Sequence, residues 1–251
     1  MNGKCEPNKD ETLDNLSCCN LSILQKKKGY RYSLDSYLLG AFVDEAPGTE
    51  VIEIGSGSGV VSILLSAVKG LHVTGIEIQE DLAEMSKRSI ERSGLSDKVK
   101  ITCCDIKDYS GPKVDTVVTN PPYRPLSTGR INPDRSKAIA RHEIALDLDV
   151  LLRKTYELLR PLGRLYIVYP AWRVPDLLCT MRARRIEPKQ MRCVYTSPTR
   201  TSEICLICGV REGGKDFTIE SPLIVYNQDN SYHHDMEMIF QSLILPKKPL
   251  T

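Results

Sequence analysis

The segment EVIEIGSGSGVVSILLSAVKG, residues 50–70, limits the possible folds of this chain more than any other stretch. Its first five residues are rich in valine and isoleucine and predict a buried strand. The glycines that follow allow positive φ angles and close approach of the backbone, and they lead into an apolar helix that ends at Gly70. A strand, a glycine turn and a helix in this order predict an α/β fold whose turn faces a ligand.

Short strand patterns alternate with longer helical patterns along the rest of the chain. Residues 80–95 have an amphipathic helical pattern that stops at Gly94, and another helix is expected over residues 147–159. The segments with strand composition are 50–54, 72–78, 99–104, 114–119, 163–169 and 202–210. This alternation predicts a mainly parallel sheet covered on both faces. In such sheets ligands bind beyond the carboxyl ends of the strands.

Composition limits the class of protein. A chain of 251 residues with 41 % hydrophobic content can form one sizeable core. No apolar run approaches the ~20 residues needed to span a bilayer, and the first twenty residues are polar, so we expect a cytoplasmic protein. The sequence leaves the oligomeric state open, with a monomer favoured. The nine cysteines are irregularly spaced and are expected to be reduced, with Cys205 and Cys208 packed in the core. A net charge of +2 gives no strong pull on an acidic partner.

The glycine turn departs from the dinucleotide pattern G-x-G-x-x-G, because its sixth position is Val60. It resembles instead the first motif of S-adenosylmethionine-dependent methyltransferases, which implies that cofactor. Glu77 ends the second strand, where a carboxylate accepts hydrogen bonds from ribose hydroxyls, and we expect it in a water-accessible crevice. The resemblance places Asp105 on the adenine amine, with Asp108 as a competitor. The cofactor-binding residues expected are Glu53, Gly55, Gly57, Gly59, Glu77, Asp105 and Asn120.

The fourth strand pattern stops at Asn120-Pro121-Pro122-Tyr123, which we interpret as the catalytic motif. Methyl transfer to an exocyclic amine needs the nitrogen lone pair in line with the methyl carbon. The Asn120 side-chain oxygen and the Pro121 carbonyl are expected to accept the two amine hydrogens, because Pro122 keeps the residue before it out of helical geometry. Tyr123 offers a flat face on which a base stacks, worth ~1–3 kcal/mol. The motif resembles those of methyltransferases acting on planar nitrogens, in adenine, cytosine, guanine or a glutamine amide.

Several segments resemble, in chain order, the bacterial tRNA(Val) adenine-N6 methyltransferase family. They are YRYSLDSYLLGAFV (30–43), NPPYRP (120–125), residues 140–173 and IEPKQMRCVY (186–195). The resemblance implies a Rossmann-like class I methyltransferase with a seven-stranded, mainly parallel sheet whose last strand is antiparallel. We expect an N-terminal extension with a hairpin and a helix over 1–45, the methyltransferase domain over 46–212, and a C-terminal tail over 213–251 packed on it. The implied substrate is an adenine in tRNA, flipped out of an RNA loop.

Two other functions remain open from the sequence. The same NPPY motif resembles glutamine-N5 methyltransferases of translation release factors, but those have a sizeable helical domain before the glycine motif, where this chain has about fifty residues. A non-catalytic RNA-binding module of the same fold is the other alternative. The intact motif from Asn120 to Tyr123 argues against it, since a site without turnover need not keep these residues together.

Basic residues are the candidates for RNA contact. A rim around the crevice is expected from Lys27, Arg31, Arg124, Arg130, Arg135 and Arg141. A second group at helical spacing fits either RNA contact or a charged outer face: Arg182, Arg184, Arg185, Lys189 and Arg192. His142-Glu143 lacks the second histidine of a zinc helix, and His233, His234 and Asp235 are expected to be solvated, so no metal is predicted.

Overall fold

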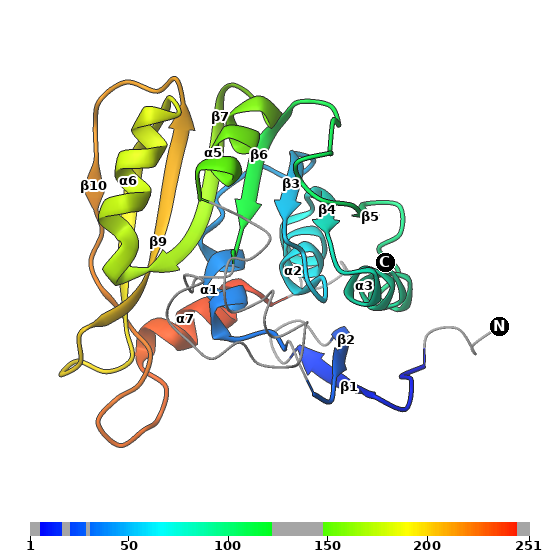
Figure 1. Cartoon of the computed structure of the whole chain (residues 1–251). Coiled ribbons are helices and arrows are strands. Elements are labelled where there is room, and N and C mark those ends of the chain that lie inside the picture. The colour runs from blue at the N-terminus through cyan, green and yellow to red at the C-terminus, as the bar shows by residue number, and fades with distance from the viewer. Residues whose placement is uncertain (1–5, 17–20, 29–30, 122–147, 245–251) are drawn as a thin grey trace, which may run out of the picture.

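The computed structural model describes residues 6–16, 21–28, 31–121 and 148–244. Its elements, drawn in Figure 1, are β1 (Glu11–Leu16), β2 (Leu21–Lys26), α1 (Leu34–Phe42), β3 (Glu50–Ile54), α2 (Val60–Lys69), β4 (His72–Glu77), α3 (Glu80–Arg92), β5 (Val99–Cys103), β6 (Val114–Thr119), α5 (Leu148–Leu158), β7 (Leu159–Pro170), the 3-10 helix η1 (Ala171–Arg173), α6 (Val174–Ala183), β8 (Ile186–Tyr195), β9 (Ser202–Arg211), β10 (Thr218–Ile219), β11 (Leu223–Ile224) and α7 (His234–Ser242).

The described strands form a small hairpin, β1–β2, and one large sheet. The large sheet has nine strands in the order β10-β8-β9-β7-β6-β3-β4-β5, with β11 also paired to β8. Strands β3 to β7 run parallel, whereas β9 runs antiparallel to its neighbours β7 and β8. The expected sheet of seven longer strands with an antiparallel last one is therefore confirmed. The two-residue strands β10 and β11 extend its edge beyond that expectation.

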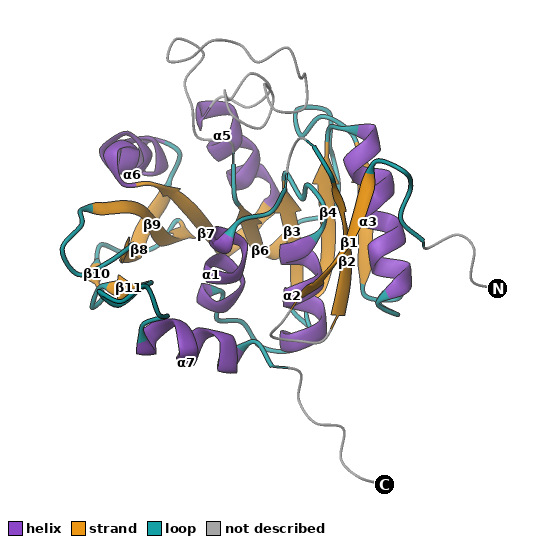
Figure 2. Ribbon diagram, turned by 90° about the horizontal axis from the view of Figure 1, so that it is seen from below, coloured by secondary structure: helices purple, strands orange, loops and turns teal. Residues whose placement is uncertain are grey.

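The central strands are apolar on both faces because helices cover both. In β6, Val118 packs into a cluster with residues of α1, α2 and α7, whereas its neighbour Val117 packs into a cluster with residues of α5 and α6. Figure 2 shows α5 and α6 on one side of the sheet and α1, α2 and α7 on the other. Successive residues of a strand point to opposite faces, so one strand packs against the helices on both sides of the sheet. Within the described ranges, no helix is both long and apolar enough to cross a membrane.

The hairpin β1–β2 packs on α3. Leu24 of β2 forms a small buried cluster with Leu82 and Met85 of that helix. The Leu24 amide donates to the Ser89 hydroxyl at 3.0 Å. An ion pair at 2.6 Å joins Arg88 of α3 to the buried Glu11 of β1. These contacts fix the hairpin close to the carboxyl ends of the first strands of the sheet (Figure 1).

The last described segment returns to α1. Helix α7 packs against α1, where the Phe240 ring meets the Tyr37 ring edge to face at 6.0 Å. His233 caps α7, because its Nδ1 accepts a hydrogen bond from the Asp235 amide at 3.2 Å. Among the described residues no cluster of three or more His, Cys, Asp or Glu could hold a metal ion.

The cysteines of β9 lie in the core, as expected. Cys205 and Cys208 are 3 % and 4 % exposed. Burial raises the pKa of each thiol to about 12, so both stay neutral at physiological pH. Neutral buried thiols are weak nucleophiles and weak metal ligands, which makes their role one of packing.

The region after α6 differs from the sequence pattern. Strand β8 was not among the predicted strands, and the predicted helical spacing of the second basic group is wrong because α6 ends at Ala183. Lys189 and Arg192 lie in β8 instead. Acidic partners lie beside most of this group: Arg182 with Glu187 at 2.6 Å, Arg184 with Asp149 at 2.5 Å, Arg185 with Glu212 at 2.8 Å, and Lys189 with Asp216. These pairs favour a charged outer face over RNA contact.

Candidate active site

The carboxyl ends of β3, β4, β5 and β6 meet at one edge of the sheet. These strands are parallel and in register, with Ile54 beside Ile76 and Thr119. The Thr119 hydroxyl also donates to the Ile54 carbonyl at 2.9 Å and ties two strand ends together. The same edge of the sheet therefore holds the residues that follow or end these strands, namely the glycine turn, Glu77, Asp105 and Asn120.

The glycine turn requires glycine at its two ends for different reasons. Gly55 and Gly59 have φ angles of 75° and 83°, in the left-handed region that side chains disfavour. A Cβ on Gly55 would meet no atom within 4 Å, so this end of the turn faces open space. A Cβ on Gly59 would lie 2.3 Å from the Ser86 Oγ of α3. Gly59 thus allows α2 and α3 to pack closely, and Gly55 leaves room for a ligand.

We predict that Gly59→Ala destabilises the cofactor-free protein by about 2–5 kcal/mol, the sum of left-handed strain and overpacking. Gly55→Ala should cost only the strain, about 1–2 kcal/mol. Adding Ser86→Ala to Gly59→Ala should recover part of the loss, because it removes the nearest clashing atom. Urea unfolding of the four proteins measures this. Equal losses for the two glycine variants would contradict the packing role.

Glu77 is buried rather than water-accessible. It is 4 % exposed, and its Oε2 accepts from the Gly57 amide at 2.7 Å while its Oε1 accepts from the Gln79 amide at 2.9 Å. Burial raises the pKa of this carboxyl, and the two amide donors oppose the rise. The expectation of an open crevice is therefore wrong, because the carboxylate turns under the glycine turn. Glu77 holds the shape of that turn besides its predicted contact with ribose.

Glu53 is a second buried carboxyl below the turn. It is 2 % exposed and accepts a hydrogen bond from the Ser62 hydroxyl of α2. Burial, with a smaller repulsion from Glu77, raises the pKa of Glu53 to about 8. At neutral pH this carboxyl is therefore protonated for most of the time. A neutral acid can donate a hydrogen bond as well as accept one.

We predict that stability falls with rising pH through this group. The unfolded chain releases the Glu53 proton near its ordinary pKa of 4.5, whereas the folded protein holds it until about pH 8. Between these values the folded state binds more protons, so the free energy of unfolding decreases as pH rises. Glu53→Gln should flatten that decrease. Urea unfolding at pH 5.5, 7 and 8.5 tests it, and parallel pH curves for the two proteins would refute the assignment.

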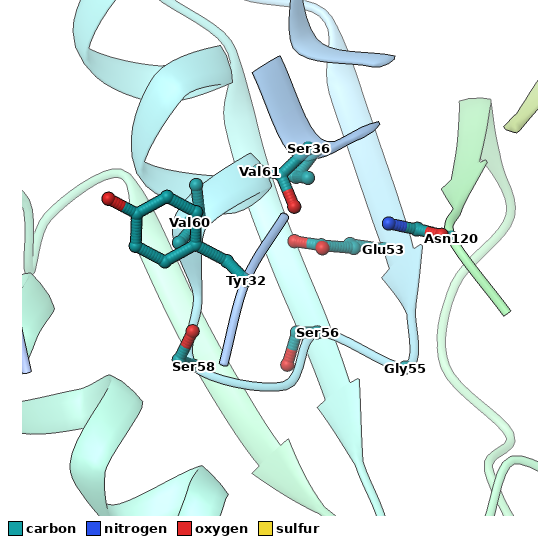
Figure 3. Close-up of a pocket in the computed structure, with 9 residues that line it drawn as sticks. All are labelled: Tyr32, Ser36, Glu53, Gly55, Ser56, Ser58, Val60, Val61 and Asn120. Atoms are coloured by element: carbon teal, nitrogen blue, oxygen red, sulfur yellow. The ribbon is translucent and has the colours of Figure 1, made fainter. Parts of the chain in front are cut away.

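A pocket lies between the glycine turn, α1 and the end of β6. Figure 3 shows Glu53 and Asn120 entering it from the neighbouring strands β3 and β6. Ser56 Oγ is buried without a hydrogen-bond partner among the described residues. The lining residues are Tyr32, Ser36, Glu53, Gly55, Ser56, Ser58, Val60, Val61 and Asn120. Open space at Gly55, the unused Ser56 hydroxyl and the carboxyl groups on this edge are groups that a polar cofactor such as S-adenosylmethionine would contact when bound.

Sequence reasoning missed several residues of this pocket. Ser36 lies in the first turn of α1, and Tyr32 lies two residues before that helix. The sequence marked both only as part of a family resemblance. Ser56 and Ser58, which lie between the glycines, have no sequence pattern that predicts a place in the pocket. Tyr32 is positioned by β2, because its amide donates to the Gln25 side chain at 3.1 Å.

Asp105 follows β5, as predicted. Its Oδ1 accepts from the Lys107 amide at 2.9 Å, and its backbone carbonyl accepts from the Asp108 amide at 3.0 Å. Asp105 is half-buried, whereas Asp108 is exposed and lies farther from the strand end. This placement favours Asp105 over Asp108 as the carboxylate that faces the crevice.

The structure describes half of the predicted catalytic motif. Asn120 lines the pocket, and Pro121 after it is buried. Six predicted residues lie outside the described residues: Pro122, Tyr123, Arg124, Arg130, Arg135 and Arg141.

The two remaining RNA candidates lie at the base of the hairpin. Lys27 Nζ donates to the Lys9 carbonyl at 2.7 Å. Arg31 donates to the Lys26 carbonyl at 2.8 Å and pairs with Asp14. Arg31 therefore fastens β1 to the end of β2, a role that its sequence position did not predict.

Comparisons with known proteins agree with this geometry. Residues 45–218 match a family described as methyltransferase domain. A protein of Porphyromonas gingivalis named tRNA1(Val) (adenine(37)-N6)-methyltransferase is 33 % identical over 67 % of this chain and 69 % of its own length. A protein of the same name from Tolumonas auensis is 26 % identical over 83 % of this chain and 87 % of its own length.

Solved structures show the same fold at low identity. A predicted O-methyltransferase from Agrobacterium tumefaciens has a TM-score of 0.67 and 14 % identity, and the match covers 86 % of this chain and 99 % of that one. Geranyl diphosphate C-methyltransferase from Streptomyces coelicolor, solved with S-adenosyl-L-homocysteine, has a TM-score of 0.52 and 16 % identity over 70 % of this chain and 76 % of its own. The chain therefore belongs to the S-adenosylmethionine-dependent class I methyltransferases, in the family of the relatives named tRNA1(Val) (adenine(37)-N6)-methyltransferase.

Proposed function

We propose that this enzyme methylates the N6 amine of an adenine in tRNA, next to the anticodon of valine tRNA. The names of the relatives supply the substrate. The observation that carries the reaction is the position of Asn120, at the carboxyl end of β6 and in the pocket of the glycine turn. A planar amine bound there would be at the same edge of the sheet as the predicted cofactor-binding residues Gly55, Glu77 and Asp105.

The task of the protein residues is to place the amine nitrogen. S-adenosylmethionine, when bound, supplies a methyl carbon on a positively charged sulfur. The adenine amine has its lone pair delocalised into the ring, so acceptors on its two hydrogens favour the tetrahedral geometry that the new C–N bond needs. We assign these acceptors to the Asn120 side-chain oxygen and the Pro121 carbonyl. The nitrogen then loses one proton to water, and no strong base is required.

The predicted cofactor-binding residues contact different parts of S-adenosylmethionine. We assign the ribose hydroxyls to Glu77, which the Gly57 and Gln79 amides hold in one rotamer. Asp105 is assigned to the adenine amine of the cofactor. Glu53 lines the pocket and is held there by the hydrogen bond from the Ser62 hydroxyl.

Transfer of labelled methyl groups tests the substrate. The purified enzyme should label unmodified tRNA and leave a release factor unlabelled under the same conditions. Label in the release factor and none in the RNA would establish the glutamine-amide activity instead. Cofactor binding without label in either substrate would support a non-catalytic module.

A further inference from the structure

Trp172 stands out among the large aromatic side chains. It is the single tryptophan of the chain and is 65 % exposed. It lies in η1, immediately after β7. By contrast, Tyr169 near the end of the same strand is fully buried. A rigid aromatic ring with this much free surface offers a platform for a planar ligand.

Trp172 lies on the same edge of the sheet as the active site. Strand β7 is the parallel neighbour of β6, with Ile167 paired to Thr119, so Val168 is level with Asn120. Trp172 follows four residues later. At no more than ~3.6 Å per residue and ~4.8 Å between strands, its Cα lies at most about 20 Å from that of Asn120. A strand of RNA with its target base at Asn120 would therefore reach Trp172 with a nearby nucleotide.

A cation contacts the Trp172 ring. The Arg173 guanidinium lies 5.3 Å from the centre of the buried Tyr169 ring and 5.7 Å from that of the Trp172 ring. Such contacts attract a cation to the ring faces. The short helix η1 also packs against β9. Arg173 therefore lies between the exposed Trp172 ring and the buried Tyr169 ring.

The charged side chains around Trp172 favour binding of a nucleic-acid base over binding of several phosphates. Arg200 is exposed in the loop between β8 and β9, at the same edge of the sheet. Carboxylates stand on the adjoining elements as well, Asp176 in the first turn of α6 and Glu203 in β9. This mixed charge gives no strong pull on phosphates, whereas an exposed aromatic face binds any base through its ring.

We propose that Trp172 stacks on a base that flanks the target adenine. A base turned out of its stack leaves its neighbours without a partner, and an aromatic side chain can replace that partner. The inference rests on the proposed function, because it needs an RNA substrate. It adds a binding residue that lies outside the cofactor pocket and the NPPY motif.

Steady-state kinetics with unmodified tRNA test the proposal. Trp172→Ala should raise KM for tRNA about 5- to 150-fold, the range that loss of one stacked base gives, with little change in kcat and none in affinity for S-adenosylhomocysteine. Trp172→Phe should keep most of the wild-type KM. Trp172→Leu, apolar but without a π face, should resemble the alanine variant. Ile219→Ala is the control, because Ile219 is 63 % exposed on β10, away from this edge.

Fluorescence reports on the same contact directly, since Trp172 is the single tryptophan. Titration of the S-adenosylhomocysteine complex with tRNA should quench the Trp172 emission. The quenching should rise over the same range of tRNA concentration as the methylation rate. Unchanged emission, or a wild-type KM in Trp172→Ala while the wild-type enzyme still methylates tRNA, would overturn the stacking role and leave the proposed function intact. A wild-type enzyme that labels no RNA would instead remove the proposed function itself.

Discussion

Asn120→Ala should lower the rate of methyl transfer by about two orders of magnitude or more and leave the affinity for S-adenosylhomocysteine nearly unchanged. The side-chain oxygen is expected to contact the amine most strongly when the nitrogen becomes tetrahedral. Removing this oxygen should therefore raise the free energy of the transition state more than that of the bound substrate. Single-turnover rates with saturating tRNA and cofactor measure the loss, and calorimetry measures the affinity.

Asn120→Asp is the matched variant, because a carboxylate keeps an acceptor at the same position. It should retain more activity than Asn120→Ala. Full turnover by the alanine variant would show that the proposed amine contact does not exist. A loss of cofactor affinity that accounts for the whole rate change would show that Asn120 acts through cofactor binding alone.

Glu77→Ala should weaken the binding of S-adenosylhomocysteine by about ten- to a hundredfold, the value of a charged hydrogen bond. It should also destabilise the cofactor-free protein by about 1–3 kcal/mol, because the buried Gly57 amide loses its acceptor. The structure therefore predicts a double effect, whereas an open-crevice carboxylate would affect binding alone. Calorimetry and urea unfolding separate the two quantities.

Glu80→Ala is the control for Glu77. Glu80 is an exposed carboxylate in the first turn of α3, where its interaction with the helix N-terminus is worth about 0.3–1 kcal/mol. Its loss should leave cofactor affinity unchanged. Stability of Glu77→Ala equal to that of the wild type would contradict the role of Glu77 in shaping the glycine turn.

The long strands of the parallel sheet were predictable because burial on both faces enriches them in valine and isoleucine, as in β3 and β6. Strand β8 was not predictable in this way. It contains Pro188, Lys189 and Gln190, and proline and charged residues normally argue against a strand. Its pairing with β9, and with the short strands β10 and β11, overrides that local preference.

The candidate site was predictable in its outline but not in its burial. Motif order placed Gly55, Glu77 and Asn120 at strand ends, and a parallel sheet brings strand ends together. Burial of Glu77 depends on the direction in which one side chain turns under the backbone of residues 55–59, which no local pattern encodes. The same holds for the hydrogen bond from Ser62 to Glu53, which joins a helix to the strand before it.

The exposure of Trp172 could not be predicted from the sequence either. It follows the apolar run LYIVYP, and a tryptophan there is as compatible with the core as with the surface. Only the end of β7 at Pro170 and the turn of η1 place it outside.

Mass spectrometry of nucleosides from valine tRNA tests the central claim most directly. RNA from a strain that lacks this protein should have lost N6-methyladenosine beside the anticodon. The wild-type gene should restore it, and a gene carrying Asn120→Ala should not. Unchanged N6-methyladenosine in the deletion strain, or full restoration by the Asn120→Ala gene, would contradict the account.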